Sequence, residues 1–182
     1  MSVAKLRPLE LDDIQLLRYW RNLDHVRSKM VFTQLIGRDD QRKWFEEINL
    51  ETTQYFIYSL DSRDIGSVHL TKINFNDKTF EGGIFCGDTS FLVHWINIWA
   101  YMMMHNHAFN SLGLDTSYVT ILKSNKSALS LNQFLGYIYS SDQDDNVSRF
   151  ILTKDRYIKA SEKLQKYFEK HKYYTNNRLG EE

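Results

Sequence analysis

Histidine and cysteine are the side chains of this sequence that most readily bind metals or act as nucleophiles. His105 and His107 stand two positions apart in a stretch with helical character. Because residues two apart on a helix point in different directions, the two imidazoles cannot share one ion, and we predict no metal site. Cys86 is the only cysteine, and a nucleophilic thiol needs a partner that generates the thiolate. We therefore expect Cys86 to be a buried structural thiol.

The composition excludes several classes of protein. The 182 residues include 23 basic and 23 acidic side chains, so the formal net charge is zero, whereas nucleic-acid and membrane-surface binders need a basic excess. A hydrophobic fraction of 42% with 25% charged residues is typical of a globular domain. The sequence shows neither a signal core nor an apolar run of about 18 residues. We expect one cytoplasmic domain, residues 1–182, with neither nucleic acid nor membrane as a partner.

The elements that position any site follow from hydrophobic periodicity and turn signals. Strands are expected at residues 5–9, 55–60, 65–75, 79–86, 118–122, 137–139 and 149–152. Helices are expected at residues 12–21, 26–30, 93–111 and 127–135, with another beginning at 39 or 40 and a C-terminal helix and tail over 155–182. The strands between 55 and 86 follow one another through short turns and predict an antiparallel meander. The whole order predicts a mixed α/β sheet with helices packed on it.

Three stretches of the chain resemble a known superfamily. The first is Leu6 to Glu10 followed by two aspartates, and the second is Phe80 to Phe85. The third is the most specific, because Asn125, the small Ala128 three positions later and the pair Gly136-Tyr137 keep the family's spacing. In these stretches, which span residues 5–140, the chain resembles the GNAT superfamily of acyl-coenzyme A N-acyltransferases. The resemblance implies a mostly antiparallel sheet of about seven strands, with splayed central strands, flanking helices and a C-terminal helix.

A closer likeness concerns two further stretches. Arg21-Asn22 with Met30 a helix further on, and Thr71 to Phe75 ahead of Gly83, are similar to stretches of the nucleotide amino-sugar N-acetyltransferases of the pseudaminic acid pathway. This likeness implies a small-molecule acceptor, an amino sugar for which a UDP carrier is one option. Relatives that acetylate protein N-termini share many of these features, so that class stays open, as does a homodimeric assembly.

The resemblance implies transfer of an acetyl group from acetyl-CoA to an amine. Amide formation from a thioester needs a neutral amine about 3 Å from the carbonyl, a stabiliser for the oxyanion and a proton for the thiolate. In the family, unpaired main-chain groups of the fourth strand hold pantetheine and polarise the carbonyl, and here they belong to Ile84, Phe85 and Cys86. The resemblance also assigns Asn125 and Ala128 to the pantetheine arm.

Two positions depart from the family's pattern. The glycine-rich loop that cradles pyrophosphate is expected near residues 92–95, where bulky residues stand instead. Either the loop has another shape, with His94, Asn97 and Ser90 donating to the phosphates and Trp95 beside them, or coenzyme binding has been lost and the domain is a non-catalytic binding module. The family's tyrosine acid is replaced by Asn132, whose amide can hydrogen-bond a sulfur but is no acid at neutral pH.

The base and the acceptor site have several candidates. His69 has a side chain whose ordinary pKa lies near the working range, and Glu81 could act through a water, although each could equally be a hydrogen-bonded strand residue. The helix and loop that cover the acceptor cleft in relatives carry Arg21, Asn22, Arg27, Met30 and Phe32. An arginine fork suits a diphosphate, and methionine with aromatics suits a deoxy-sugar or uracil. The alternative for both arginines is a solvated helix face.

The sequence therefore predicts an acetyl-CoA-dependent N-acetyltransferase that acts on a small amino sugar by direct attack in a ternary complex, without a metal. A protein N-terminal acetyltransferase and a non-catalytic GNAT domain are the alternatives.

Overall fold

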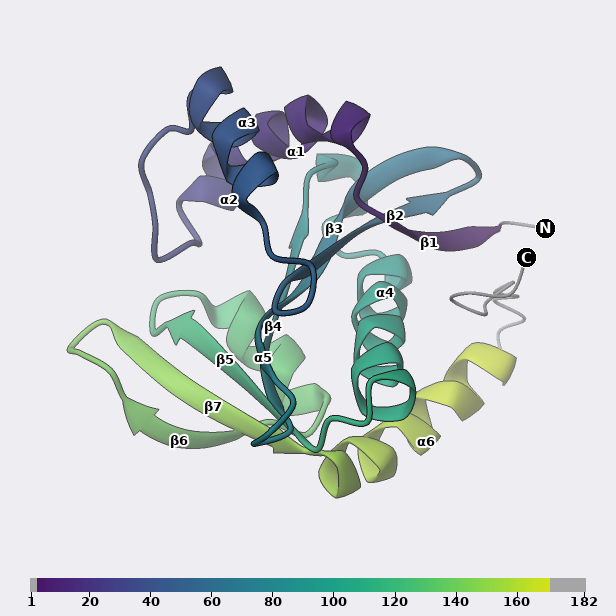
Figure 1. Ribbon diagram of the computed structural model, residues 1–182. Coiled ribbons are helices and arrows are strands. Elements are labelled where there is room, and N and C mark those ends of the chain that lie inside the picture. Colours follow the sequence, from purple (N-terminus) through teal and green to yellow (C-terminus); the bar gives the residue numbers. More distant parts are fainter. Residues whose placement is uncertain (1–2, 171–182) are drawn as a thin grey trace.

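The computed structural model describes residues 3–170 of the chain (Figure 1). The strands are β1 (Ala4–Pro8), β2 (Gln54–Leu60), β3 (Arg63–Asn74), β4 (Thr79–Cys86), β5 (Thr116–Leu122), β6 (Ile138–Asp142) and β7 (Val147–Thr153). The helices are α1 (Ile14–Asn22), α2 (Asp24–Arg27), α3 (Arg38–Glu47), α4 (Trp95–Asn106), α5 (Lys126–Phe134) and α6 (Lys154–Lys170). Residues 171–182 of the expected C-terminal helix and tail lie outside the described residues. No helix within residues 3–170 is long and apolar enough to cross a membrane.

The strands form one sheet in the order β1-β2-β3-β4-β5-β7-β6. Neighbouring strands run antiparallel, except β4 and β5, which are parallel. This confirms the predicted mixed, mostly antiparallel sheet of seven strands with a C-terminal helix. Strand β4 has the bounds expected from the sequence, since the turn residues 76–78 precede it directly.

The long central helix differs from its prediction at both ends. It begins at Trp95 instead of residue 93, because the His94 side chain caps it: Nδ1 of His94 accepts the N–H of Ile96 at 3.3 Å. Its regular part stops at Asn106 and continues as one π-helical turn. Gly113 then takes a φ of +69°, which glycine adopts without the penalty of a side chain, and the chain turns into β5.

The first helix also begins later than the sequence indicates. The expected N-cap Asp12 lies inside a short 3₁₀ turn, because Asp13 accepts the main-chain N–H of Glu10 at 2.9 Å and caps that turn instead. Helix α2 ends at Arg27, earlier than the predicted stretch 26–30. Met30 therefore lies in the following loop.

Each face of the sheet has its own core, because strand side chains alternate between the faces. Tyr58 of β2 packs with α4, α5 and α6, while its neighbour Ile57 packs with α1 and α2. The core under α4 is the larger and is rich in aromatic side chains. Figure 1 shows α1, α2 and α3 grouped together, apart from the pair formed by α4 and α6.

Strands β4 and β5 separate after three residue pairs. Their parallel register begins at Thr79 and ends at Glu81, opposite Tyr118. Beyond this point β4 remains paired only with β3, and β5 only with β7. Those main-chain groups of β4 from Gly82 onward that do not point at β3 therefore face a gap on the β5 side. The candidate site lies in this gap between the two diverging strands.

Candidate active site

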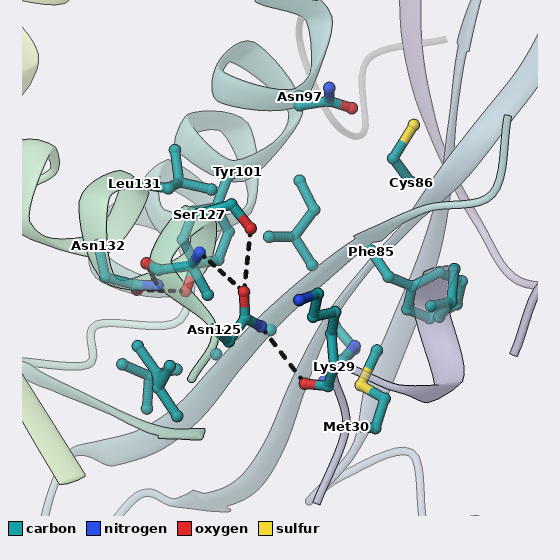
Figure 2. Close-up of a pocket in the computed structure, with 18 of the residues that line it drawn as sticks. Lys29, Met30, Phe85, Cys86, Asn97, Tyr101, Asn125, Ser127, Leu131 and Asn132 are labelled. Atoms are coloured by element: carbon teal, nitrogen blue, oxygen red, sulfur yellow. Dashed lines mark hydrogen bonds between the residues drawn. The ribbon is translucent and has the colours of Figure 1, made fainter. Parts of the chain in front are cut away.

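A cavity of about 530 Å³ occupies the gap between β4 and β5. Its walls are β4 from Glu81 to Cys86, β5 from Val119 to Ile121, the inner sides of α4 and α5, and the segment that follows α2 (Figure 2). Its size is in the range that proteins use for small ligands. An extended ligand arm can lie along the free edge of β4 and pair with its main chain, as a further strand would.

The β4 residues divide between the two sides of the cavity. Ile84 and Cys86 pack with the core under α4, whereas Phe85 packs with α1 and α2. Burial raises the pKa of the Cys86 thiol, and its Sγ lies 3.2 Å from the carbonyl oxygen of Asp88. A half-buried thiol that remains protonated fits the structural role expected from the sequence.

Asn125 connects three parts of the cavity wall. Its Oδ1 accepts the N–H of Ala128 at 3.2 Å and the hydroxyl of Ser127 at 2.9 Å, which caps α5. Its Nδ2 donates to the carbonyl oxygen of Lys29 at 3.4 Å, and Figure 2 shows Asn125 between these partners. Asn125 thus ties the end of β5 to the segment that follows α2.

The other end of this segment reaches β4. Nε2 of His25, on α2, lies 3.1 Å from the carbonyl oxygen of Cys86. With the Lys29–Asn125 hydrogen bond, residues 25–29 therefore touch the tips of both diverging strands. This segment closes the cavity on the side of α1 and α2.

His69 lies on the same side, between an aromatic ring and a glycine. Its imidazole stacks on Tyr55, with ring centroids 4.7 Å apart and planes inclined by 22°. On its other side is Gly83, where a Cβ would lie only 2.2 Å from Nε2 of His69. Burial, and secondarily the positive charge of Arg21, lowers the pKa of His69 to about 4, so its imidazole is neutral at pH 7. Its Nδ1 has no hydrogen-bond partner within the described residues.

Glu81 stands where the cavity begins. Its Oε1 lies 3.1 Å from Nζ of Lys72, which belongs to an irregular stretch of β3 and has a positive φ of 51°. The carboxylate of Glu81 therefore reaches the cavity already paired with a cation.

Arg21 carries a partly buried charge without an acidic partner in the structure described. Its Cζ lies 5.9 Å from the ring centroid of Phe85, and its Nη1 is buried without a hydrogen-bond partner among residues 3–170. Burial lowers the pKa of Arg21, and it stays ionised because an arginine titrates far above neutral pH. Phe85 and His69, both beside Arg21, line the cavity. The guanidinium thus lies just behind the cavity wall.

Of the other residues expected at the acceptor site, one lines the cavity and three do not. Met30 lines the cavity. Asn22 instead makes two hydrogen bonds to the main chain of Ile36. Its Nδ2 donates to the carbonyl oxygen and its Oδ1 accepts the N–H, each at 2.9 Å. Arg27 pairs with Asp24 and the carbonyl of Thr33, and Phe32 is exposed to solvent, so Asn22, Arg27 and Phe32 do not line the cavity.

The loop between β4 and α4 is held by hydrogen bonds instead of glycines. Nδ2 of Asn97 donates to the carbonyl of Phe91 at 2.6 Å, and Oδ1 of Asn97 accepts the hydroxyl of Tyr58 at 2.6 Å. Both ends of this amide are engaged in shaping the loop, which differs from its expected contact with a phosphate. His94 lines the cavity, and because its Nδ1 accepts the N–H of Ile96, the hydrogen of its neutral ring lies on Nε2.

Trp95 is turned away from the cavity. It packs against the core under α4 and contacts Phe168 of α6, with ring centroids 6.0 Å apart. Of the side chains that we expected around the phosphates, His94 is therefore the one that lines the cavity with a hydrogen free to donate.

Asn132 lines the cavity together with Tyr101, a residue that the sequence did not single out. The hydroxyl of Tyr101 donates to Oδ1 of Asn132 at 3.1 Å. Tyr101 stands in an almost uniformly apolar helix, so its sequence position gave no signal that its hydroxyl reaches a site.

The contacts of His105 and His107 show what each imidazole binds. Nε2 of His105 lies 2.9 Å from the hydroxyl of Tyr137, and Nε2 of His107 lies 2.9 Å from Oε1 of Gln54. The two imidazoles therefore serve separate partners. Within residues 3–170, no three acidic, histidine or cysteine side chains gather as a metal site would require.

A protein-family model described as the acetyltransferase (GNAT) domain matches residues 4–138. The chain belongs to this family. A GNAT protein is an acyltransferase that uses acetyl-CoA to acetylate an amine, so the chain is an acetyl-CoA-dependent N-acetyltransferase. No curated protein matches the sequence at a significant level.

Solved structures share this fold at low sequence identity. A domain from Methanocaldococcus jannaschii is 18% identical with a TM-score of 0.76, covering 84% of this chain and 99% of its own. FdhC, described as a nucleotide-linked sugar GNAT, is 22% identical with a TM-score of 0.75, covering 89% and 93%. Spermidine N-acetyltransferase from Vibrio cholerae, solved with CoA and spermine, is 17% identical with a TM-score of 0.74, covering 85% and 98%.

The residues present fit the pantetheine part of a GNAT coenzyme. The free edge of β4 offers main-chain donors and acceptors from Gly82 onward, and the cavity runs beside it. The phosphate end is built differently from the glycine loop of the family, because N–H groups of Ile96 and Asn97 in the first turn of α4 already bond to His94. On the cavity side His94 offers the hydrogen of its Nε2.

Proposed function

We propose that this GNAT enzyme acetylates the amino group of a small, anionic acceptor, namely a nucleotide-linked amino sugar. The observation that carries the proposal is the partly buried Arg21 guanidinium, which lies behind Phe85 and whose buried Nη1 has no hydrogen-bond partner in the part of the chain described. A partly desolvated cation without a counter-ion is costly, and an anionic ligand at the adjacent wall lowers that cost.

The charges on the α1–α2 side of the cavity support the same class of acceptor. Lys29 lines the cavity on this side, and the carboxylate of Glu81 is paired with Lys72. This side is therefore net positive, which attracts a diphosphate and repels a polyamine cation. The fold is shared with a nucleotide-sugar GNAT and with a polyamine GNAT alike, so the charge distribution is what favours the first.

The mechanism that we propose uses a few groups of this chain. His69 or Glu81 takes the proton that the amine loses, with Glu81 acting through a water. A neutral His69 can accept a proton, although its pKa of about 4 makes it a weak base. The main-chain groups of Ile84, Phe85 and Cys86 that stay free at the edge of β4 orient the thioester and polarise its carbonyl, while the carbonyl oxygen of Cys86 is already bonded to His25.

The leaving-group side belongs to Asn132, with Asn125 and Ala128 beside the pantetheine arm. The amine nitrogen forms a bond to the acetyl carbon, the carbon–sulfur bond breaks, and its electron pair goes to sulfur. Asn132 then faces the thiolate as a neutral hydrogen-bond donor.

The test is an acceptor panel with purified protein and acetyl-CoA. A UDP-linked amino sugar, spermidine and an N-terminal peptide are compared by kcat/KM, and we expect the UDP-amino sugar to be preferred. Arg21→Met should raise KM for that acceptor about tenfold, because it removes a positive charge that lies just behind the cavity wall and attracts the diphosphate through it. Arg27→Met is the matched control, because Arg27 is already paired with Asp24 and lies off the cavity, and it should change KM less than about twofold.

A preference for spermidine, or an Arg21→Met variant that acetylates spermidine better and leaves the UDP-amino sugar unaffected, would replace the proposal with a polyamine acceptor. A preference for the peptide would replace it with N-terminal acetylation.

A further inference from the structure

A line of buried polar side chains runs from the core under α4 to the cavity wall. It begins at His105, whose Nδ1 lies 2.8 Å from the carbonyl oxygen of Tyr101 and whose Nε2 lies 2.9 Å from the hydroxyl of Tyr137. A carbonyl only accepts, so Nδ1 carries the hydrogen. Burial lowers the pKa of His105 to about 4, the ring is neutral at pH 7, and Nε2 accepts from Tyr137. Ser117 must then donate to Tyr137, at 2.6 Å.

The same reasoning fixes the orientation of Asn132. Tyr101 donates its only hydroxyl hydrogen to Oδ1 of Asn132 at 3.1 Å, since an amide oxygen can only accept. On the other side, Nδ2 of Asn132 donates to the carbonyl oxygen of Ala128 at 2.8 Å. The amide is held at both ends and cannot flip without losing two buried hydrogen bonds.

One hydrogen of this amide remains for a ligand. Nδ2 carries two hydrogens, and within residues 3–170 its hydrogen bonds use only the one directed at Ala128. Asn132 is 3% exposed and lines the cavity, so the second hydrogen belongs to the cavity wall. We propose that Tyr101 is a positioning residue for the leaving group, holding Asn132 so that its second N–H stabilises the CoA thiolate. This rests on the sulfur-side role proposed above for Asn132.

The chemistry of this arrangement is hydrogen bonding without proton transfer. When the carbon–sulfur bond breaks, the electron pair and the negative charge stay on sulfur, and the amine's proton goes to the base. Burial keeps the pKa of Tyr101 well above its ordinary value, so Tyr101 stays protonated and continues to hold Asn132. The thiolate leaves as the anion and takes its proton from solvent.

The test measures the pKa of the CoA thiol bound to the protein, from thiolate ultraviolet absorbance during a pH titration. It needs no acceptor, so its outcome is independent of the proposed sugar nucleotide. A parallel titration without CoA removes the contribution of Cys86. The other charged or titratable groups on the cavity wall are Lys29, Glu81, His25, His69 and His94, and they are the same in every variant compared.

We expect the wild-type protein to lower the pKa of the bound thiol below that of free CoA. Tyr101→Phe should raise it again by about 0.5–1 unit, a three- to tenfold loss of preference for the thiolate. Tyr157→Phe is the matched control, since it also removes one buried phenol hydroxyl, but that hydroxyl bonds to Met102 and Asn106 and its loss leaves the Tyr101–Asn132 hydrogen bond in place. It should lower stability and leave the thiol pKa within about 0.2 units of the wild type.

Asn132→Leu keeps the experiment decisive if Tyr101→Phe does not fold. It should shift the thiol pKa at least as far, and the double variant should shift it no further, because both changes remove one interaction. An unchanged thiol pKa in Tyr101→Phe, an equal shift in Tyr157→Phe, an additive double variant or a wild type that binds no CoA would each overturn the proposal.

Discussion

Gly83 offers the sharpest perturbation of the proposed base. A Cβ at this position would lie 2.2 Å from Nε2 and 2.4 Å from Cε1 of His69, and ordinary contact begins at 3.4 Å. In Gly83→Ala the imidazole must therefore move by roughly 1 Å, and Tyr55 is stacked on its other face. The ring can escape only by turning within the cavity or by displacing Tyr55.

The expected cost of this displacement follows from its size. A misplacement of about 1 Å can lower a catalysed rate about 100-fold, so we expect kcat to fall about 10- to 100-fold. Overpacking should lower the free energy of unfolding by about 1–3 kcal/mol. Affinity for CoA, measured by calorimetry, should change less than about twofold, because the main chain of β4 keeps its extended conformation.

Gly82→Ala is the matched control on the neighbouring residue. Its Cβ would meet the terminal Cε of Met104 at 3.1 Å, on the opposite side of the strand, and a methionine end can move aside. Turnover should stay within about twofold of the wild type. Full activity in Gly83→Ala, or an equal loss when Gly83→Ala is made in a His69→Ala background, would refute the reasoning, because the substitution would then act without His69.

Three further outcomes are expected. Both His69 and His105 have a pKa of about 4 in the folded chain and an ordinary pKa near 6.5, so the unfolded chain binds more protons between these two pH values. The free energy of unfolding, measured by urea titration, should therefore fall as the pH drops from 6.5 to 4. A constant free energy of unfolding would contradict the burial of both rings. Asn22→Ala removes two hydrogen bonds to the loop before α3 and should cost about 1–3 kcal/mol of stability with an unchanged acceptor KM, whereas a raised KM with unchanged stability would return Asn22 to the acceptor site. Tyr58→Phe removes the phenol that holds Asn97 and should weaken CoA binding by calorimetry about three- to tenfold, and an unchanged affinity would show that the loop does not depend on this bond.

The sequence was informative where local chemistry decides the structure. Strand β4 could be delimited because a turn precedes it. Since strand side chains alternate between the two faces, His69 points to the face of the sheet away from its apolar neighbours Val68 and Leu70. The start of α4 was wrong by two residues, since apolar Leu92 and Val93 extend the helical pattern. Only the fold shows that the His94 side chain caps the helix there.

The rest of the candidate site depends on contacts between distant parts of the chain. Tyr101 and Asn132 are 31 positions apart, and no local pattern says that their side chains meet. Asn22 has the residue type of a ligand-binding amide, yet its partner is Ile36, which only the path of the intervening loop brings near. Such polar pairs are satisfied by tertiary structure, and a sequence shows the groups without showing which of them are already engaged.

The short parallel register between β4 and β5 has a mechanical consequence. Three residue pairs join the half of the sheet formed by β1 to β4 to the half formed by β5 to β7. So short a seam leaves the width of the cleft, and any pivot of the two halves about it, to be set by the shared core under α4 and by the hydrogen bonds of residues 25–29 to both sides. A coenzyme arm lying along the free edge of β4 acts as a brace across that pivot, so stiffness should rise with coenzyme concentration. The acetyl donor would then be a structural part of the enzyme for as long as it is bound.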